Sequence, residues 1–396
     1  METYDHLILG GGMTAQAAVE GIREIDPDAT IGLITEESYP PYKRPPLSKK
    51  LWKDLPLKEI WYDIEKLDVH LHKVCRILAL DPVQRFVTDA TGKTYQYKKL
   101  LLATGGTPRK LPVEGVPIIY FRTLEDYLNL RNQSGHKKKM AVIGGGFIGS
   151  EIAAALATNH DEVMMIFPET GINERILPGH LSIFLNRYYE DRKVQVISRH
   201  ILTRVERRGD SYLLNLKSVA TGMESIREAD VIVAGLGIVP SDALAKKAGL
   251  KVSDGVEVDE YLCTSHPDIY AAGDVANFYS QALKRRVRIE HEDNALQMGR
   301  CAGRNMAGAG HPYTHLSYFY SDLFDLGYEA VGELDPRLDT VEDWVEPHHK
   351  GVIYYRKDEI VRGVLLWNVW DQVPKARALI ESNKPMAPSA LKGLIS

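Results

Sequence analysis

The chain has 396 residues, which is enough for two or three domains of ordinary size. Its 49 Lys and Arg residues nearly balance 53 Asp and Glu residues, so the net charge of -4 gives no general attraction to nucleic acid or to an anionic membrane. No apolar run reaches the ~18 residues of a membrane span. The first predicted strand begins so early that we expect no signal or transit peptide and a cytoplasmic protein.

A short apolar run at residues 6–9 predicts the first strand, and a glycine cluster separates it from a predicted helix at residues 15–23. Gly10, Gly12 and Ala15 occupy the three positions of a dinucleotide-binding fingerprint. The glycines allow the backbone to approach a pyrophosphate, and the helix N-terminus offers free N–H groups and a positive dipole end. This stretch therefore predicts a phosphate-binding loop.

Acidic residues follow two later predicted strands. The strand at residues 30–35 ends at Glu36, where a carboxylate can accept hydrogen bonds from ribose hydroxyls. Residues 269–276 predict a strand that ends in Gly273 and Asp274, and an acid at this end suits a ribitol hydroxyl if it lies beside a dinucleotide. On the pattern alone, Asp274 is equally well explained as the N-cap of a following helix.

The same arrangement recurs later in the chain. Residues 140–143 predict a strand, a helix continues from the next glycine cluster, and the following strand at residues 163–167 precedes Glu169. The fingerprint positions are Gly144, Gly146 and Gly149. Two complete units in one chain predict two dinucleotides that exchange electrons, one a tightly held flavin and the other a mobile nicotinamide.

The three cysteines are far apart, and none belongs to a C-x-x-C pair or to a Cys/His spacing typical of zinc. We therefore predict neither a disulfide framework nor a metal site. Cys75, Cys263 and Cys301 are each interpreted as a small buried hydrophobic residue. Two basic runs, at residues 137–139 and 284–288, are interpreted as solvated loop charges, and no nucleic-acid partner is expected.

Several motifs together resemble a known family. The paired glycine loops, "ATGG" at residues 103–106 and "AAGDV" at residues 271–275 resemble flavoprotein reductases with two dinucleotide-binding domains. "YKRPPLSK" at residues 42–49 narrows the resemblance to the apoptosis-inducing factor-like and ferredoxin reductase-like branch of the FAD-dependent pyridine nucleotide oxidoreductases. Stretches such as "RIEHEDNALQMGRCAGRNMAG" and "YSDLFDLGYEAVGEL" extend it over most of the chain.

The resemblance implies FAD in the first site. It places the pyrophosphate on Gly10, Gly11, Gly12, Met13 and Thr14. It places the adenosine ribose on Glu36 and the adenine near Val74. The other implied contacts are Arg44 and Lys49 beside the flavin, Arg109 and Asp274 along the cofactor, and His291 and Tyr320 on either side of the isoalloxazine ring.

The resemblance implies NADH in the second site. The residues that it assigns to NADH are Gly145, Gly146, Phe147, Ile148, Glu169, Arg175, Gly237, Glu290, Glu329 and Asn368. Glu169 stands where the 2′-phosphate of NADPH would lie, which favours NADH.

The predicted fold is α/β, with two Rossmann-like dinucleotide-binding domains and a small α+β C-terminal domain. Residues 1–115 and 241–313 are expected to form a discontinuous FAD-binding domain, and residues 116–240 the NADH-binding domain. Residues 314–396 would form the third unit, where residues 351–355 and 360–367 predict a hairpin. In that unit Asp371 is expected to cap a closing helix.

Two charged residues are the predicted catalytic pair. Lys49 is expected near flavin N5, where a fixed cation stabilises the reduced ring. Glu151 directly follows the second glycine loop and could pair with Lys49. From the pattern alone, Glu151 is also explained as an acid favoured by the dipole in the first helical turn. Residues 290–293 predict a helix start whose dipole could stabilise charge near flavin N1.

Residues 42–51 contain no cysteine, so no redox disulfide is expected beside the flavin. We therefore predict an NADH-dependent flavoprotein reductase that transfers hydride to FAD and passes electrons directly to a small redox protein, a quinone or another acceptor. The alternative is an NADH-sensing protein that forms a stable FADH–NAD charge-transfer complex and then recruits a partner or dimerises.

Overall fold

The structure is a computed structural model and describes residues 2–395. Its residues form two compact units. The first comprises the described residues of Met1–Arg44, Pro56–Thr107 and Val239–Phe319, and the second comprises those of Pro45–Leu55, Pro108–Ile238 and Tyr320–Ser396. The expected division into three domains remains a prediction. Strands β7 (Gly106–Pro108) and β16 (Ile238–Pro240) lie where the chain passes between units.

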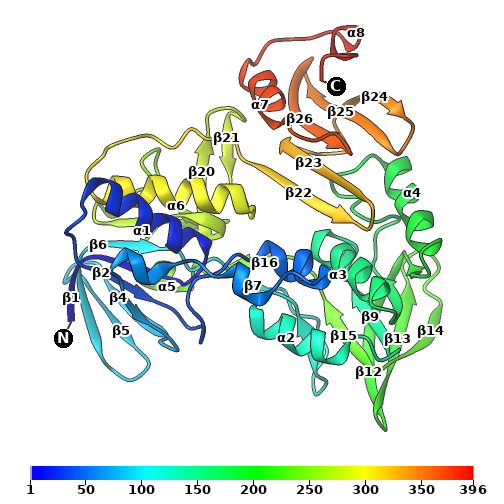
Figure 1. Cartoon of the computed structure of the whole chain (residues 1–396), viewed down its shortest axis with the longest axis horizontal. Helices are drawn as coiled ribbons and strands as arrows, with labels where there is room; N and C mark the ends of the chain where they lie inside the picture. The colour runs from blue at the N-terminus through cyan, green and yellow to red at the C-terminus, as the bar shows by residue number, and fades with distance from the viewer. Residues whose placement is uncertain (1, 396) are drawn as a thin grey trace. The chain divides into compact units, whose positions relative to one another are not determined.

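A seven-stranded sheet forms the centre of the first unit (Figure 1). Its order is β3-β2-β1-β6-β5-β4, and β19 pairs with β6. The strands β1, β2, β3, β6 and β19 run parallel, so their carboxyl ends meet at one edge. The strands are β1 (Glu2–Leu9), β2 (Ile31–Ile34), β3 (His70–His72), β4 (Ile77–Asp81), β5 (Phe86–Asp89), β6 (Thr94–Leu102) and β19 (Ile269–Ala271).

Two helices pack side by side against this sheet (Figure 1). They are α1 (Met13–Ile25) and α6 (Glu292–Met306). A Cβ at Gly299 would lie 2.3 Å from the Thr14 carbonyl oxygen, and one at Gly303 would lie 2.0 Å from that of Ala18. The two backbones therefore approach more closely than any side chain would allow.

Smaller elements complete the first unit. A second sheet has the order β17-β18-β20-β21. The three cysteines, predicted to be small buried hydrophobic residues, are free thiols that pack against the core of this unit and are only partly buried. The remaining elements are α5 (Ala243–Lys247), β17 (Val252–Ser253), β18 (Gly255–Glu257), β20 (Ala276–Ser280), β21 (Arg285–Val287), η3 (Leu57–Ile60), η4 (Ile64–Leu67) and η5 (Gly273–Val275).

The second unit contains a five-stranded parallel sheet of order β11-β10-β9-β15-β8. A three-stranded antiparallel sheet, β12-β13-β14, accompanies it. The strands are β8 (Ile118–Tyr120), β9 (Lys139–Ile143), β10 (Glu162–Ile166), β11 (Gln195–Ile197), β12 (His200–Arg208), β13 (Ser211–Ser218), β14 (Glu224–Ala229) and β15 (Val231–Ala234). The helices are η1 (Pro45–Ser48), η2 (Lys50–Lys53), α2 (Leu124–Gln133), α3 (Phe147–Thr158) and α4 (Gly179–Glu190).

The C-terminal part of the second unit is a five-stranded sheet of order β22-β23-β26-β25-β24. The predicted hairpin is present, and Asp358 and Glu359 form its turn with positive φ angles of 51° and 63°. The elements are β22 (Tyr318–Leu323), β23 (Leu326–Gly332), β24 (Asp339–Glu346), β25 (Lys350–Lys357), β26 (Ile360–Trp367), α7 (Val373–Glu381) and α8 (Pro388–Leu391). The N-cap of α7 is Gln372, so the prediction of Asp371 as the cap was wrong.

Helix α4 and the loop before it contact the C-terminal sheet of the second unit. The Tyr355 hydroxyl donates to the Ile176 carbonyl at 2.6 Å. The Arg192 guanidinium lies 3.5 Å from the centre of the Tyr188 ring, and Tyr188 donates to Asp325 in the β22–β23 turn. These contacts fix the C-terminal sheet to the parallel sheet of the same unit.

Candidate cofactor sites

The first cradle lies at the carboxyl end of β1. The Gly10 backbone has φ +123°, and a Cβ there would lie 2.1 Å from the Ala103 carbonyl oxygen. A Cβ on Gly12, the N-cap of α1, would meet only the Arg44 Nε, at 3.9 Å. The chain therefore turns tightly at Gly10 and leaves space at Gly12, at a helix N-terminus that suits a pyrophosphate.

Arg44 forms one wall of this cradle. It pairs with Glu37, which also accepts a hydrogen bond of 2.6 Å from the Tyr42 hydroxyl. Burial alone would lower the pKa of Arg44, but the Glu37 carboxylate outweighs this effect and the pKa is raised. Sequence reasoning selected Glu36 and missed Glu37; only the contact with Arg44 identifies Glu37.

Glu36 and Val74 lie on neighbouring segments at the end of the sheet. The Val74 N–H donates to the Glu37 carbonyl at 3.3 Å, and the Glu36 side chain is 68 % exposed. Val74 is 74 % exposed and has φ 53°, an uncommon conformation for a β-branched residue. An exposed apolar side chain held in this way is suited to contact an adenine ring.

A short turn after β19 forms the opposite wall. It is η5, which contains Asp274 and has Ala272 as its N-cap, so the alternative of Asp274 as a helix cap was wrong. A Cβ on Gly273 would lie 2.2 Å from the Thr14 Oγ1. The turn therefore packs directly on the first turn of α1.

Arg288 holds this wall, and sequence reasoning missed it. Its side chain is only 8 % exposed. The guanidinium donates to the Asp274 carbonyl at 3.2 Å, to Glu290 Oε1 at 2.6 Å and to Asp254 Oδ1 at 3.0 Å. For this residue the interpretation of residues 284–288 as solvated charges was wrong.

His291 is the N-cap of α6 and stacks on Phe319, with ring centroids 4.1 Å apart and planes at 15°. Burial lowers the pKa of His291 to about 4, although the charges of Asp274 and Asp293 act in the opposite direction. The imidazole is therefore neutral at pH 7. Sequence reasoning expected Tyr320 to accompany His291 and overlooked Phe319.

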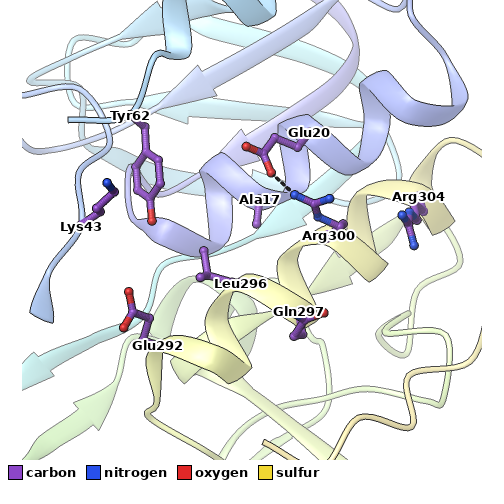
Figure 2. A pocket seen from close by; sticks show the side chains of 9 residues that line it. All are labelled: Ala17, Glu20, Lys43, Tyr62, Glu292, Leu296, Gln297, Arg300 and Arg304. Atoms are coloured by element: carbon purple, nitrogen blue, oxygen red, sulfur yellow. Dashed lines mark hydrogen bonds and ion pairs between the residues drawn. The ribbon is translucent and has the colours of Figure 1, made fainter. Parts of the chain in front are cut away.

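A cavity of about 660 Å³ lies beside the first cradle, between α1 and α6 (Figure 2). Its charges are largely compensated, because Arg300 pairs with Glu20 and Glu24, and Arg304 also pairs with Glu24. The residues that line it are Ala17, Glu20, Lys43, Tyr62, Glu292, Leu296, Gln297, Arg300 and Arg304. Because these ion pairs join α1 to α6, we interpret the cavity as a gap in the packing of the two helices and not as a ligand site.

The second cradle lies at the carboxyl end of β9. A Cβ on Gly144, which has φ +117°, would lie 2.4 Å from the Gly235 carbonyl oxygen. Gly146 is the N-cap of α3, and a Cβ there would meet no atom within 4 Å. Phe147 and Ile148 follow in the first turn, and Ile148 is 37 % exposed. This loop has room for a second pyrophosphate.

Glu169 lies three residues beyond β10 and forms an ion pair with Arg175 at 2.7 Å. The Arg175 side chain is 83 % exposed and that of Glu169 is 22 % exposed. The Gly237 carbonyl accepts the Arg109 N–H at 3.0 Å, and a Cβ on Gly237 would meet open space. These residues form an open border around the cradle.

Lys49 and Glu151 are in direct contact within the second unit. Lys49 Nζ donates to Glu151 Oε2 at 2.7 Å, and their side chains are only 9 % and 2 % exposed. Lys49 also lies 5.2 Å from the centre of the Tyr320 ring. The contact explains the position of Glu151 better than a helix dipole does, because Glu151 is the fifth residue of α3.

The segment Pro45–Leu55 brings Lys49 to this position. The Trp52 indole donates to the Leu47 carbonyl at 2.7 Å, and the Tyr127 hydroxyl donates to the Leu51 carbonyl at 3.2 Å. The Trp52 and Tyr127 rings meet edge to face. These contacts anchor the segment on α2.

Glu329 and Asn368 occupy the C-terminal sheet. The Asn368 amide accepts from the Gly327 N–H at 2.8 Å and donates to the His349 carbonyl at 2.9 Å. Burial raises the pKa of Glu329, and among the described residues its Oε2 atom has no hydrogen-bond partner. Glu329 Oε2 is therefore an enclosed acceptor, whereas the Asn368 amide is engaged within the sheet.

Within residues 2–395, no three His, Cys, Asp or Glu side chains are placed to hold a metal ion together. Among the helices that the structure describes, none combines the length and the apolar character needed to cross a bilayer.

The geometry is that of a flavoprotein reductase with two dinucleotide sites. The chain belongs to the pyridine nucleotide-disulphide oxidoreductase family, whose model matches residues 4–299. Residues 302–349 and 342–382 match the C-terminal domain of mitochondrion-associated apoptosis-inducing factor. Membership implies FAD and NAD(P)H as cofactors, and the chain is a ferredoxin reductase-like flavoprotein.

Individual relatives show the same likeness. The chain is 30 % identical to putative apoptosis-inducing factor 1, mitochondrial, of Drosophila melanogaster, over 96 % of this chain and 63 % of that protein. It is 32 % identical to the ferredoxin reductase subunit of 5,5'-dehydrodivanillate O-demethylase of a Sphingobium species. The match covers 84 % of this chain and 82 % of that protein. Putidaredoxin reductase, solved in covalent complex with putidaredoxin, superimposes with a TM-score of 0.90 at 26 % identity, over 100 % of this chain and 96 % of that chain.

Proposed function

We propose that this chain oxidises NADH with bound FAD and passes the electrons directly to an acceptor, without a redox disulfide of its own. The observation that carries the proposal is the presence of two complete cradles, each at a helix N-terminus with space at its second glycine. FAD supplies the hydride-accepting chemistry when bound. The chain supplies binding, orientation and electrostatics.

The first cradle is proposed to hold FAD. Its fit rests on the space at Gly12 and on the largely buried side chain of Arg44, which is 20 % exposed and whose guanidinium suits a phosphate. Glu36 and Val74 would bind the adenosine, and Asp274 the ribitol. His291 would contact the ring as a neutral imidazole, and the N-terminus of α6 directly after it would favour negative charge.

The second cradle is proposed to hold NADH. Gly145, Gly146, Phe147 and Ile148 would carry the pyrophosphate, and Glu169 would accept from the adenosine ribose. A carboxylate at this position repels the 2′-phosphate of NADPH. Glu329 is proposed to contact the same ligand.

Lys49 is proposed to act at the flavin. A fixed cation near N5 stabilises the negative charge that reduction adds, and its effect is large because the side chain is almost excluded from water. Glu151 orients the ammonium group through the hydrogen bond of 2.7 Å. The pair therefore provides charge stabilisation that needs no rearrangement during the reaction.

Direct transfer is supported by the cysteines, because all three are free and none lies in residues 42–51. We propose a small ferredoxin-type protein as the acceptor, since two of the relatives described above are reductases of a ferredoxin and of putidaredoxin. The family name includes disulphide reductases, but this chain offers no cysteine pair for that route.

A second candidate function is redox sensing, in which a long-lived reduced complex recruits a partner or a second copy. The match of residues 302–349 and 342–382 to the C-terminal domain of apoptosis-inducing factor favours it.

Stopped-flow reduction tests both candidates. The purified yellow protein is mixed anaerobically with NADH. The reduced protein is then exposed to air, to a quinone or to an oxidised ferredoxin. Rapid reoxidation by one carrier is expected for the reductase, whereas a reduced form that persists for minutes in air identifies the sensor. A wild-type protein that takes up no FAD would contradict the assignment of the first cradle.

A further inference from the structure

The loop that joins β10 to α4 borders the second cradle. It carries Glu169, which is proposed to accept from the adenosine ribose of NADH, and Arg175, which pairs with Glu169. Residues 171–173 of this loop are buried, although they belong to no strand or helix. Buried backbone N–H and C=O groups need hydrogen-bond partners, and a loop without regular structure must find them in neighbouring segments.

Two side chains on one face of α4 provide such partners. The Asn186 amide accepts the Ile172 N–H at 3.1 Å and donates to the Thr170 carbonyl at 2.9 Å. Ser182, one helical turn earlier, donates its hydroxyl to the Ile172 carbonyl at 2.5 Å. The Asn186 side chain therefore pairs with alternate residues of the loop, as one residue of a parallel neighbouring strand would.

The loop is also bonded to the second cradle itself. The Asn173 N–H donates to the Gly145 carbonyl at 2.8 Å, and Asn173 is only 4 % exposed. At the other end of the loop, the Arg199 N–H donates to the Glu169 carbonyl at 3.0 Å. The segment that carries Glu169 is therefore held by α4, by the glycine loop and by the turn before β12.

We propose that Asn186, assisted by Ser182, is a positioning residue that holds Glu169 at the border of the second cradle and thereby sets the discrimination between NADH and NADPH. This inference rests on the proposed function, because it assumes that NADH binds in the second cradle with its adenosine ribose at Glu169. The loop, α4 and the second cradle all belong to the second unit.

A carboxylate repels the 2′-phosphate of NADPH strongly only while it is held close to that phosphate. The repulsion between like charges weakens as their separation grows and as water enters between them. Arg175, the ion-pair partner of Glu169, is 83 % exposed and lies on the same loop, so this pair cannot anchor the loop to the rest of the unit. The contacts with Asn186 and Ser182 can, because both residues lie on α4.

The test measures the affinity of the FAD-loaded protein for ADP-ribose and for its 2′-phosphorylated form by isothermal titration calorimetry. These probes carry the adenosine end of the nucleotide and need no hydride transfer. The wild type should bind ADP-ribose about tenfold more tightly, and Asn186→Ala should reduce this preference to about threefold or less. An unchanged preference in Asn186→Ala would overturn the proposal, even if both affinities fell.

Matched variants separate positioning from stability. In the Glu169→Ala background, Asn186→Ala should leave the preference unchanged, because no carboxylate remains to be positioned. A further fall in that background would overturn the proposal. Asn305→Ala is the control, since this amide also holds a loop, in the first unit, by accepting the His311 N–H at 2.8 Å and donating to the Tyr261 carbonyl at 2.9 Å. It should lower thermal stability and keep the wild-type preference.

Ser182→Ala keeps the inference testable if Asn186→Ala does not fold. It removes only the hydroxyl that donates to Ile172, so the preference should fall by a smaller factor in the same direction. If the preference falls in no folded variant, the proposal is overturned while the proposed function stands. A wild-type protein that binds neither probe would instead contradict the proposed NADH site, and with it the proposed function.

Discussion

The two glycine cradles share one local design and differ in the walls around it. Both place a helix N-terminus after a buried parallel strand, and both leave space for a ligand at the N-cap glycine. Two arginines in the walls of the first cradle, Arg44 and Arg288, are only 20 % and 8 % exposed, and both are paired with acids. The border of the second cradle is largely exposed.

Three contacts close the first cradle. Arg44, whose side chain is 20 % exposed, pairs with Glu37. The turn at Gly273 packs on Thr14, and Arg288 holds the same turn with a side chain that is 8 % exposed. In the second cradle the corresponding acid, Glu169, pairs with an Arg175 that is 83 % exposed.

From the comparison we expect the glycine fingerprint to specify pyrophosphate binding, and the walls contributed by distant segments to set the residence time of the ligand. A ligand enclosed by buried, paired groups must break several contacts before it leaves. A ligand on an open border can exchange in every catalytic cycle. This difference supports the proposal that the first site holds the resident cofactor and the second site the substrate.

Arg44→Ala should have the largest effect on the difference between the cradles, because it removes part of the wall of the first cradle. The loss of a charge-assisted hydrogen bond of 1.5–3 kcal/mol predicts an affinity for FAD that is about 10- to 100-fold weaker. Fluorescence titration of the apoprotein with FAD measures this. Arg175→Ala, on the second cradle, is the control and should retain FAD; equal FAD loss in both variants would remove the distinction between the walls.

Lys49→Ala separates binding from chemistry. Ser48 and Ser321 still hold Glu151 in this variant, so neither cradle should lose its ligand. The flavin potential should fall, and reduction by NADH should slow by about tenfold for each 1.4 kcal/mol of lost stabilisation. Stopped-flow rates at saturating NADH measure the effect, with Lys50→Ala as a neighbouring control. An unchanged rate would exclude Lys49 from the flavin site.

Glu169→Ala sharpens the assignment of the second cradle. Like charges ~4 Å apart cost about 4 kcal/mol at an effective dielectric near 20. Partial exposure and Arg175 reduce this cost, so the wild type should prefer NADH over NADPH about tenfold, at about 1.4 kcal/mol. The variant should lose most of that preference without losing FAD. Equal rates with both nucleotides in the wild type would contradict the role of Glu169.

The smallest expected effect concerns His291 in the first unit. Burial of this residue should make the free energy of unfolding depend on pH. Its pKa of about 4 lies below the ordinary value of 6.5, so the unfolded chain binds the proton more tightly. Stability is therefore lost as the pH falls from 6.5 towards 4, by about 1 kcal/mol between pH 7 and 5.5. Urea unfolding of wild type and His291→Asn measures it. The exposed His311→Asn should keep the wild-type slope, and a slope unchanged in His291→Asn would contradict the assignment.

Local patterns were sufficient to predict both cradles. Apolar runs, glycines at fixed spacing and a following acid all lie within about 35 residues of one another, so the sequence displays the whole unit at once. The hairpin of β25 and β26 was predicted for the same reason. Its ends are held by a two-residue turn, and no distant segment is needed to specify it.

The errors and omissions fall where distant segments meet. Glu37, Arg288 and Phe319 gain their importance from contacts with Arg44, Asp274 and His291, which no spacing rule reveals. Residues 284–288 look like a solvated basic run, yet one of these arginines is buried because three acceptors surround it. The three cysteines were expected in the core, but the packing leaves them at its margin.

The sequence by itself determined that the chain has two dinucleotide cradles, since each is encoded by contiguous residues whose conformation follows from glycine and strand propensities. It also indicated the Lys49–Glu151 pair through a resemblance. Only the tertiary structure decided how that pair is held. Ser48 and Ser321 reach Glu151 because η1 and β22 pack against α3, and the buried carboxylate must find donors there, since water is excluded.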